Sequence, residues 1–270
     1  MSKNCIVVLI NHNKPQQVNE LIQNLNSYFV EKNKDVDLLL FHEYGFPFET
    51  ITETYNGGNV IKHEINFDIY QFDESIRNEV PDIYYGFTIG YRMMCRFFSG
   101  ELFKILKTYD YEYMMRLDTD SKFLEPVNRN LFDEFKNNNA LYGYICVMND
   151  RMEVRVNLLE TVLTYIKNND LKPILSIDDD IRHQYNLIFY NNFEMIKVSE
   201  FVSDRYLNYY EHLNSTNGFL KYRWGDAPVR FLYVISFIET NQIHYFSDLA
   251  YFHNFNLKNR PFLLEKLYLN

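Results

Sequence analysis

The sequence predicts an α/β fold in which helices flank a mostly parallel sheet. The chain has 270 residues, of which 47% are apolar and 23% charged, enough to bury the core of one large domain. Short apolar runs alternate with segments whose apolar residues recur at helical spacing, a pattern typical of βα units. No linker rich in Pro, Gly or Ser interrupts the chain. We therefore expect a single domain over residues 1–270.

The first half of the chain carries the clearest strand and helix signals. A continuous apolar run at residues 5–10 predicts a buried strand, and Pro15 then opens a segment with a helical apolar stripe. Three more strands are predicted at residues 37–41, 59–65 and 111–117. Ligands of such sheets bind where the strands end, so the polar residues after each strand are the first candidates for a site.

The second half is less regular. Helical patterns are found at residues 154–166, 204–213 and 227–238, and residues 243–246 predict a late strand. We expect residues 178–180, three aspartates, to form a solvated loop and residues 257–270 to pack as a C-terminal extension.

Charge and cysteine content exclude several classes of protein. Lys and Arg total 27 against 36 Asp and Glu, and a net charge of −9 disfavours nucleic acid as a partner. Cys5, Cys95 and Cys146 lie far apart without a CxxC pair, which indicates free thiols and a reducing compartment. No apolar stretch approaches the roughly 18 residues that span a bilayer. We expect a soluble, cytoplasmic protein with no transmembrane segment.

Several motifs that carry chemistry are absent from the sequence. The nine glycines form neither a dinucleotide-binding fingerprint nor a P-loop, so the backbone that would cradle phosphates there is missing. No nucleophile elbow and no HExxH helix is found, which disfavours hydrolases and zinc proteases. The remaining candidates are acidic.

Two carboxylates, Asp118 and Asp120, directly follow the apolar strand at residues 111–117. Carboxylates at a strand end are hard oxygen ligands for Mg²⁺ or Mn²⁺, which can neutralise a nucleotide diphosphate. This is the DxD arrangement of glycosyltransferases, although a solvated acidic loop has the same pattern. A dehalogenase-type phosphatase also carries D-x-D, but Lys122 stands where that class has Thr or Val.

Longer segments resemble the fungal Golgi α-1,2-mannosyltransferase family, whose fold is GT-A-like. Residues 91–100 (YRMMCRFFSG) are similar to the family's block YRxMCRFxSG, and residues 223–229 (RWGDAPV) to part of its block ERWGDAPVH. Further similar blocks are found at residues 113–120, 185–194, 209–213 and 243–253. The blocks occur in the family's order over nearly the whole chain, so chance similarity is a poor explanation.

The resemblance implies a nucleotide-sugar site that holds a metal. It assigns Mn²⁺ to Asp118 and His253, a mixed carboxylate and imidazole set that suits this ion. Asp120 is expected to reach the metal or the ribose. Tyr91 and Arg116 match residues that contact the nucleotide sugar, and arginine is well suited to diphosphate.

The resemblance also implies the catalytic residues. Glu194 matches the family's candidate nucleophile, because retention of configuration needs a carboxylate near the anomeric carbon. Asp226 opens a predicted helix, so we expect it to be an N-cap, the partner of the acceptor hydroxyl, or both. The chain departs from the family at Asn11 and His12, where the family has Arg-Asn, so the family's nucleoside recognition is not carried over to this strand end. It also departs at residues 188–190, so we expect different packing of the sugar under Glu194.

We therefore predict a retaining, metal-dependent α-mannosyltransferase that uses GDP-mannose and a glycan or glycoprotein acceptor. Residues 1–120 would bind the nucleotide sugar and residues 121–270 the acceptor. Family members carry an N-terminal membrane anchor and stem, and we expect this protein to work without them. One alternative keeps the fold with another nucleotide sugar, and a second is a catalytically silent glycan-binding module.

Overall fold

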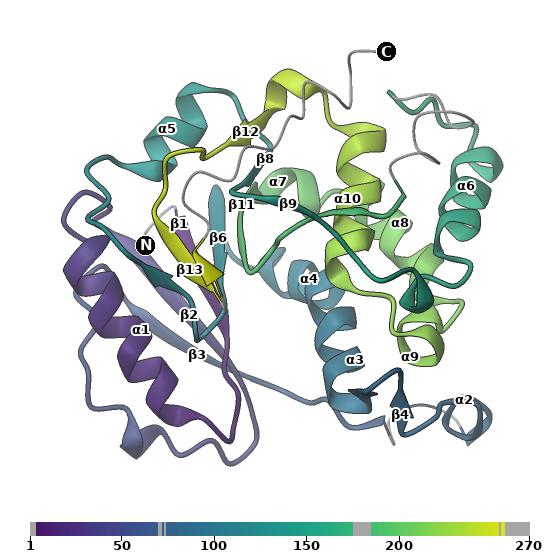
Figure 1. The fold of residues 1–270 in the computed structure, drawn as a ribbon, viewed down its shortest axis with the longest axis horizontal. Coiled ribbons are helices and arrows are strands. Elements are labelled where there is room, and N and C mark those ends of the chain that lie inside the picture. The colour runs from purple at the N-terminus through teal and green to yellow at the C-terminus, as the bar shows by residue number, and fades with distance from the viewer. Residues whose placement is uncertain (1–3, 70–71, 73, 175–184, 254, 257–270) are drawn as a thin grey trace.

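A seven-stranded sheet forms the centre of the protein (Figure 1). The structure is a computed structural model that describes residues 4–69, 72, 74–174, 185–253 and 255–256. The order of the strands across the sheet is β12-β8-β11-β6-β1-β2-β3. Their bounds are β1 (Asn4–Leu9), β2 (Val36–Glu43), β3 (Val60–Ile65), β6 (Tyr113–Leu117), β8 (Tyr142–Tyr144), β11 (Phe193–Lys197) and β12 (Ile243–Tyr245).

The sheet is mostly parallel, as the sequence predicts. β1 pairs in parallel with β2 and β6, β2 pairs in parallel with β3, and β12 pairs in parallel with β8. Only β11 runs against its neighbours in this sheet, and it is inserted between β6 and β8. Its reversed direction places the start of β11 beside the end of β6, which matters for the site described below.

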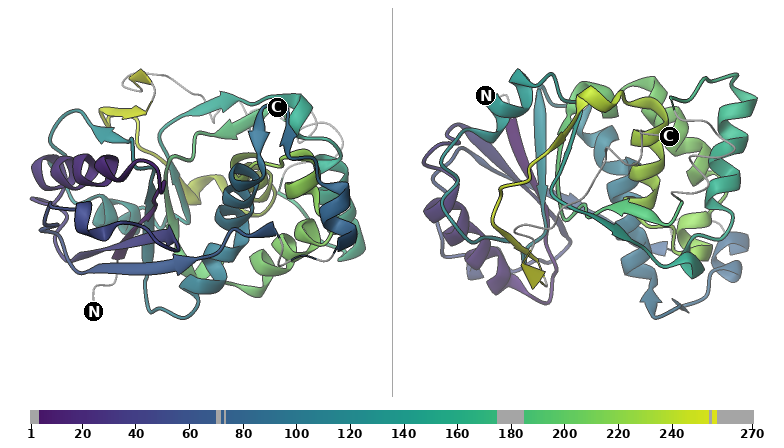
Figure 2. Two further views of the ribbon diagram at one scale, coloured as in Figure 1. Left: turned by 90° about the horizontal axis from the view of Figure 1, so that it is seen from below. Right: turned by 45° about the horizontal axis from the view of Figure 1, so that its top comes forward.

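Helices cover both faces of the sheet (Figures 1 and 2). One face packs against α1 (Pro15–Tyr28) and α5 (Leu131–Asn137), and the other against α4 (Leu102–Leu106), α7 (Val198–Phe201), α8 (Asp204–Asn214) and α10 (Asp226–Phe237). Alternate residues of β1 serve the two cores: Ile6 and Val8 face α1, whereas Cys5 and Val7 face the α10 side.

The remaining elements are short or lie at the periphery. The helices are α2 (Glu74–Glu79), α3 (Ile89–Arg96), the π-helix η3 (Phe97–Glu101), α6 (Leu158–Asn168), α9 (Gly218–Tyr222) and the 3₁₀ turns η1 (Phe48–Thr50), η4 (Met152–Val154) and η6 (Thr240–Gln242). The short strands are β4 (Ile83–Tyr84), β5 (Phe87–Thr88), β7 (Lys122–Phe123), β9 (Val147–Asn149), β10 (Leu187–Phe189), β13 (Tyr251–His253) and β14 (Phe255–Asn256).

A small second sheet joins two distant segments of the chain. β13 pairs antiparallel with β7, with Phe252 opposite Lys122 and Tyr251 opposite Phe123. β7 begins two residues after Asp120, so this pairing brings His253 to the loop that carries the two aspartates. The sheet order is β14-β13-β7.

Most predicted elements are found, with shifted ends. The helix predicted at residues 154–166 begins at Leu158, after the turn η4, and the aspartates at 178–180 and the tail at 257–270 lie outside the described residues. All three cysteines are free and buried, as predicted. No helix in the described part of the chain is both long and apolar enough to cross a membrane.

Candidate active site

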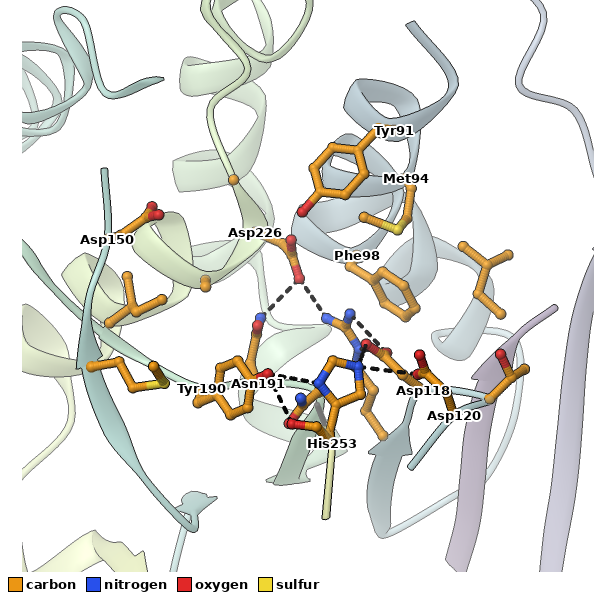
Figure 3. Close-up of a pocket in the computed structure, with 18 of the residues that line it drawn as sticks. Tyr91, Met94, Phe98, Asp118, Asp120, Asp150, Tyr190, Asn191, Asp226 and His253 are labelled. Carbon is orange, nitrogen blue, oxygen red and sulfur yellow. Dashed lines mark hydrogen bonds and ion pairs between the residues drawn. The ribbon is translucent and has the colours of Figure 1, made fainter. Parts of the chain in front are cut away.

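A pocket of about 600 Å³ opens where β1 and β6 end (Figure 3). Six of the seven predicted site residues line it: Tyr91, Arg116, Asp118, Asp120, Asp226 and His253. Asn11, at the end of β1, also lines the pocket, whereas His12 is not among the lining residues. The fold thus gathers at one place predicted site residues that lie up to 162 positions apart in the sequence, from Tyr91 to His253.

His253 contacts both aspartates of the D-x-D segment. Its Nε2 lies 3.1 Å from Oδ1 of Asp120 and 3.7 Å from Oδ2 of Asp118. On the other side of the ring, the Tyr190 hydroxyl hydrogen-bonds Nδ1 at 2.6 Å. Tyr190 therefore orients the imidazole so that Nε2 faces the carboxylates (Figure 3).

The two aspartates have opposite pKa shifts. The hydrogen bond with His253 lowers the pKa of Asp120, although partial burial opposes the shift. Burial raises the pKa of Asp118, and the nearby charges of Arg116 and His253 offset this only in part. A neighbouring cation would therefore stabilise the ionised form of Asp118 more than that of Asp120.

The donor atoms of this cluster suit a divalent cation. Carboxylate oxygens and one imidazole nitrogen form a mixed set that favours Mn²⁺ over Ca²⁺. Within the described residues, no group of three or more His, Cys, Asp or Glu already stands in metal-binding geometry. His253 instead contacts the carboxylates of Asp118 and Asp120 directly. A cation would replace the contacts between His253 and the carboxylates.

Arg116 contacts both Asp118 of the D-x-D segment and Asp226 at the start of α10. Its Nη1 donates to Oδ2 of Asp226, while Nε and Nη2 lie 3.3 and 3.2 Å from Oδ1 of Asp118. Its guanidinium stacks on the ring of Phe98, 3.5 Å from the centroid. Burial alone would lower the pKa of Arg116, but the neighbouring carboxylates raise it overall, so the side chain stays charged.

Asp226 does not cap its helix. α10 begins at Asp226, and Gly225 holds the N-cap position without a side-chain bond, so the N-cap expectation is wrong. The Asp226 carboxylate instead accepts hydrogen bonds from Arg116 and, at 2.8 Å, from the amide of Asn191. Burial would raise the pKa of Asp226, but these two partners lower it overall. The pocket therefore contains an ionised carboxylate at the start of α10.

Glu194 lies beneath the pocket rather than in it. Glu194 stands directly opposite Arg116 in the antiparallel pairing of β11 with β6, so both side chains are on the face that packs against α10. Its side chain is completely buried, receives Nε of Arg230 at 3.1 Å and does not line the pocket. The structure thus places the candidate nucleophile beside Arg116 but outside the pocket that the other six predicted site residues line.

Tyr190, Asn191, Asp150 and Arg223 are among the lining residues that the sequence did not single out as site residues. Tyr190 and Asn191 reach the pocket because β11 runs antiparallel and starts beside Asp118. The backbone N–H of Asp118 donates to the Asn192 carbonyl at 3.3 Å. Asp150 and Arg223 line the far side of the pocket. The polar run at residues 190–192, directly before an apolar strand, is the signal that could have located the first two.

The comparison with known families identifies the chain. Residues 1–262 match the model of the family described as glycolipid 2-alpha-mannosyltransferase. The chain belongs to this family. The resemblance predicted from the sequence blocks is thereby confirmed.

Two curated relatives of the chain come from fungi. The O-glycoside alpha-1,2-mannosyltransferase homolog 3 of Schizosaccharomyces pombe is 33% identical over 199 residues, which cover 70% of this chain and 53% of that protein. A probable mannosyltransferase of Candida albicans is 28% identical over 264 residues, 92% of this chain and 69% of that protein. The chain spans about half the length of the first of these relatives.

Solved structures of two mannosyltransferases share the fold. Core-mannan synthase A from Aspergillus fumigatus, in its Mn/GDP form, has a TM-score of 0.81 at 20% identity, over 96% of this chain and 77% of that one. Ktr4p from Saccharomyces cerevisiae, in complex with GDP, has a TM-score of 0.78 at 21% identity, over 94% of this chain and 71% of that one. The predicted GT-A-like fold is confirmed.

Proposed function

We propose that the protein transfers mannose from GDP-mannose to a hydroxyl of a glycan or glycoprotein, with retention of the α configuration and with a divalent cation. The meeting of Asp118, Asp120 and His253 beside the Arg116–Asp226 ion pair, in one pocket, carries this proposal. Family membership supports it. So does the Mn/GDP form of the similar synthase from Aspergillus fumigatus.

The donor would bind with its diphosphate toward the D-x-D segment. Asp118 and His253 would hold Mn²⁺, with Asp120 as a further ligand or as a partner of the ribose. When bound, the cation supplies positive charge that neutralises the diphosphate. Tyr91 would contact the nucleotide sugar, since its ring lines the pocket and is 38% exposed.

Arg116 and Asp226 would act at the reacting centre. Arg116 holds Asp226 as an ionised acceptor, and that carboxylate would receive a hydrogen bond from the attacking hydroxyl. In a same-face reaction, the bond from the anomeric carbon to the phosphate oxygen breaks. The acceptor oxygen bonds to that carbon, and its proton passes to the departing phosphate. GDP and the mannosylated acceptor are the products.

Glu194 enters this proposal as a charge beneath the reacting centre. Because its carboxylate is buried and paired with Arg230, a bond to the anomeric carbon would first require the pocket floor to open. In the described geometry the carboxylate instead acts through Arg116, which stands opposite it on β6. This favours the same-face route over a covalent glycosyl-enzyme.

The roles of the two halves of the chain and the cellular location remain predictions. If residues 1–120 bind the nucleotide sugar, His253 of the second half also belongs to that site, because it contacts Asp118 and Asp120. A cytoplasmic location rests on the sequence-based expectation alone.

Donor choice is tested by thermal shift with GDP, UDP, CMP and dTDP sugars, each with Mn²⁺ and with EDTA. A ligand at a free concentration of about 100 times its dissociation constant stabilises the folded state by about 2.7 kcal/mol. We expect stabilisation by GDP-mannose with Mn²⁺ only. Stabilisation by another nucleotide sugar would favour the first alternative. Binding of GDP-mannose without hydrolysis or transfer would favour a silent glycan-binding module.

A further inference from the structure

A second polar cluster lies across the pocket from the D-x-D segment. Asp150 and Arg223 both line the pocket. In Figure 3, Asp150 lies on one side, Asp118 and Asp120 lie on the other, and Asp226 is between them. A donor whose diphosphate is held at Asp118 would therefore leave the Asp150 side of the pocket to another molecule.

Arg223 is rigidly held but incompletely bonded. Its side chain is 10% exposed, its guanidinium stacks on the ring of Phe87 at 4.1 Å, and Nη2 donates to the Tyr91 hydroxyl at 3.1 Å. Nε and Nη1 are buried and have no hydrogen-bond partner among the described residues. The backbone is left-handed there, with φ 55°, an uncommon conformation for a residue with a side chain. Two donors of a fixed cation are thus left for a ligand.

Asp150 supplies the matching acceptor. Its Oδ2 lies 3.7 Å from Nη1 of Arg223, beyond hydrogen-bond distance, and 3.4 Å from Nε of Arg155. Arg155 is fully buried and donates its other nitrogens to the carbonyls of Tyr185 and Leu187. Arg155 therefore anchors the carboxylate, which remains beside the two open donors of Arg223.

This arrangement suits a neutral sugar better than a phosphate. Each sugar hydroxyl donates one hydrogen bond and accepts others, so two neighbouring hydroxyls match a guanidinium and a carboxylate side by side. A phosphate would meet the negative charge of Asp150. A pocket with a few convergent polar groups is the usual form of a small-ligand site.

We propose that Arg223 and Asp150 form the subsite for the acceptor's terminal sugar and grip two of its neighbouring hydroxyls. The subsite directs a further hydroxyl of that sugar toward Asp226. This inference rests on the proposed function, because it assigns the acceptor to the side of the pocket that the donor leaves open.

The test measures sugar binding separately from nucleotide binding. Methyl α-mannoside binding is followed by ligand-observed NMR, and GDP binding with Mn²⁺ by calorimetry, for wild type, Arg223→Gln and Asp150→Asn. Arg205→Gln is the matched control, because Nε of Arg205 also donates to a tyrosine hydroxyl, that of Tyr233 at 3.1 Å, but outside the pocket. Thermal melts confirm folding, and Arg223→Lys keeps the charge if Arg223→Gln does not fold.

We expect both pocket variants to weaken mannoside binding and to raise its KM as acceptor by about tenfold or more, with GDP affinity within about twofold. The control should match wild type. No mannoside binding to wild type, unchanged binding in both variants, or a tenfold loss of GDP affinity would overturn the subsite. Wild-type protein that binds the mannoside but neither binds GDP nor transfers mannose would contradict the proposed function. In that case, the comparison of mannoside binding between wild type and the two pocket variants would still test the subsite.

Discussion

Arg230 on α10 donates its Nε to Oε2 of Glu194 on β11 at 3.1 Å, and both side chains are completely buried. Nη2 of Arg230 donates to the Phe98 carbonyl at 2.9 Å, and Nη1 donates to the Tyr206 hydroxyl. Phe98 in turn stacks on Arg116 at the pocket floor. The ion pair thus links the core on the α10 side to the residues around the reacting centre.

Breaking this pair should destabilise the protein strongly, because one charge would remain buried without its partner. We expect Arg230→Met or Glu194→Gln to lower the free energy of unfolding by about 3–5 kcal/mol each. The double variant should lose clearly less than the sum. Urea denaturation of the four proteins measures the coupling, and single effects that add within about 0.5 kcal/mol would show that the pair does not act as a unit.

Glu194→Gln should also separate turnover from donor binding. We expect kcat to fall by about a hundredfold while GDP affinity stays within about twofold, because a buried charge near the reacting centre acts chiefly on the transition state. Glu200→Gln is a matched control, since the Glu200 carboxylate, like that of Glu194, pairs with an arginine, here Arg205, but lies outside the pocket. A near wild-type transfer rate of Glu194→Gln would show that the Glu194 charge does not contribute to transfer.

Nucleotide binding should depend on a divalent cation. The diphosphate would otherwise meet the carboxylates of Asp118 and Asp120, so GDP should bind strongly with Mn²⁺ and weakly with EDTA. Asp118→Asn and His253→Ala should weaken Mn²⁺-dependent GDP binding by about tenfold or more. His244→Ala is the control, because His244 pairs with Glu134 at 2.9 Å outside the pocket. Equal GDP affinity in EDTA would refute the metal site.

The Arg116–Asp226 pair should make stability depend on pH in the acid range. The pKa of Asp226 is lowered below its unfolded value of about 3.9, so its stabilising contribution is present above about pH 4. It is lost as the pH falls through the lower folded pKa. Asp226→Asn should therefore cost about 3 kcal/mol at pH 7 and progressively less below pH 4. A difference in free energy of unfolding between wild type and Asp226→Asn that stays constant from pH 7 to pH 3 would contradict this.

Strong local patterns predicted the framework of the fold and the metal-ligating candidates. The strand at residues 5–10, the helix after Pro15 and the carboxylates after residues 111–117 are each encoded within one segment of the chain. Strands of three residues, such as β8 and β12, carry too little periodicity to reveal their partners or direction, although the segment of β12 was itself predicted.

Long-range pairings decided what local patterns could not. The burial of Glu194 follows from its register opposite Arg116, and the place of His253 follows from the pairing of β13 with β7. Asp226 has the sequence position of a helix cap, but Arg116 and Asn191, which lie 110 and 35 positions away, compete for its carboxylate and bind it. Such contacts depend on the folded sheet.

Retaining transfer of mannose from GDP-mannose is tested most directly by the anomeric configuration of the first-formed product. Wild-type protein with GDP-mannose, methyl α-mannoside and Mn²⁺ is followed by NMR. The one-bond carbon–proton coupling at the anomeric carbon of the new linkage is read as the product appears, because the H1–H2 coupling of mannose is small in both anomers. We predict an α-linked product that forms with Mn²⁺ and not with EDTA. A β-linked product would contradict the account, and would make Asp226 the general base of an inverting reaction.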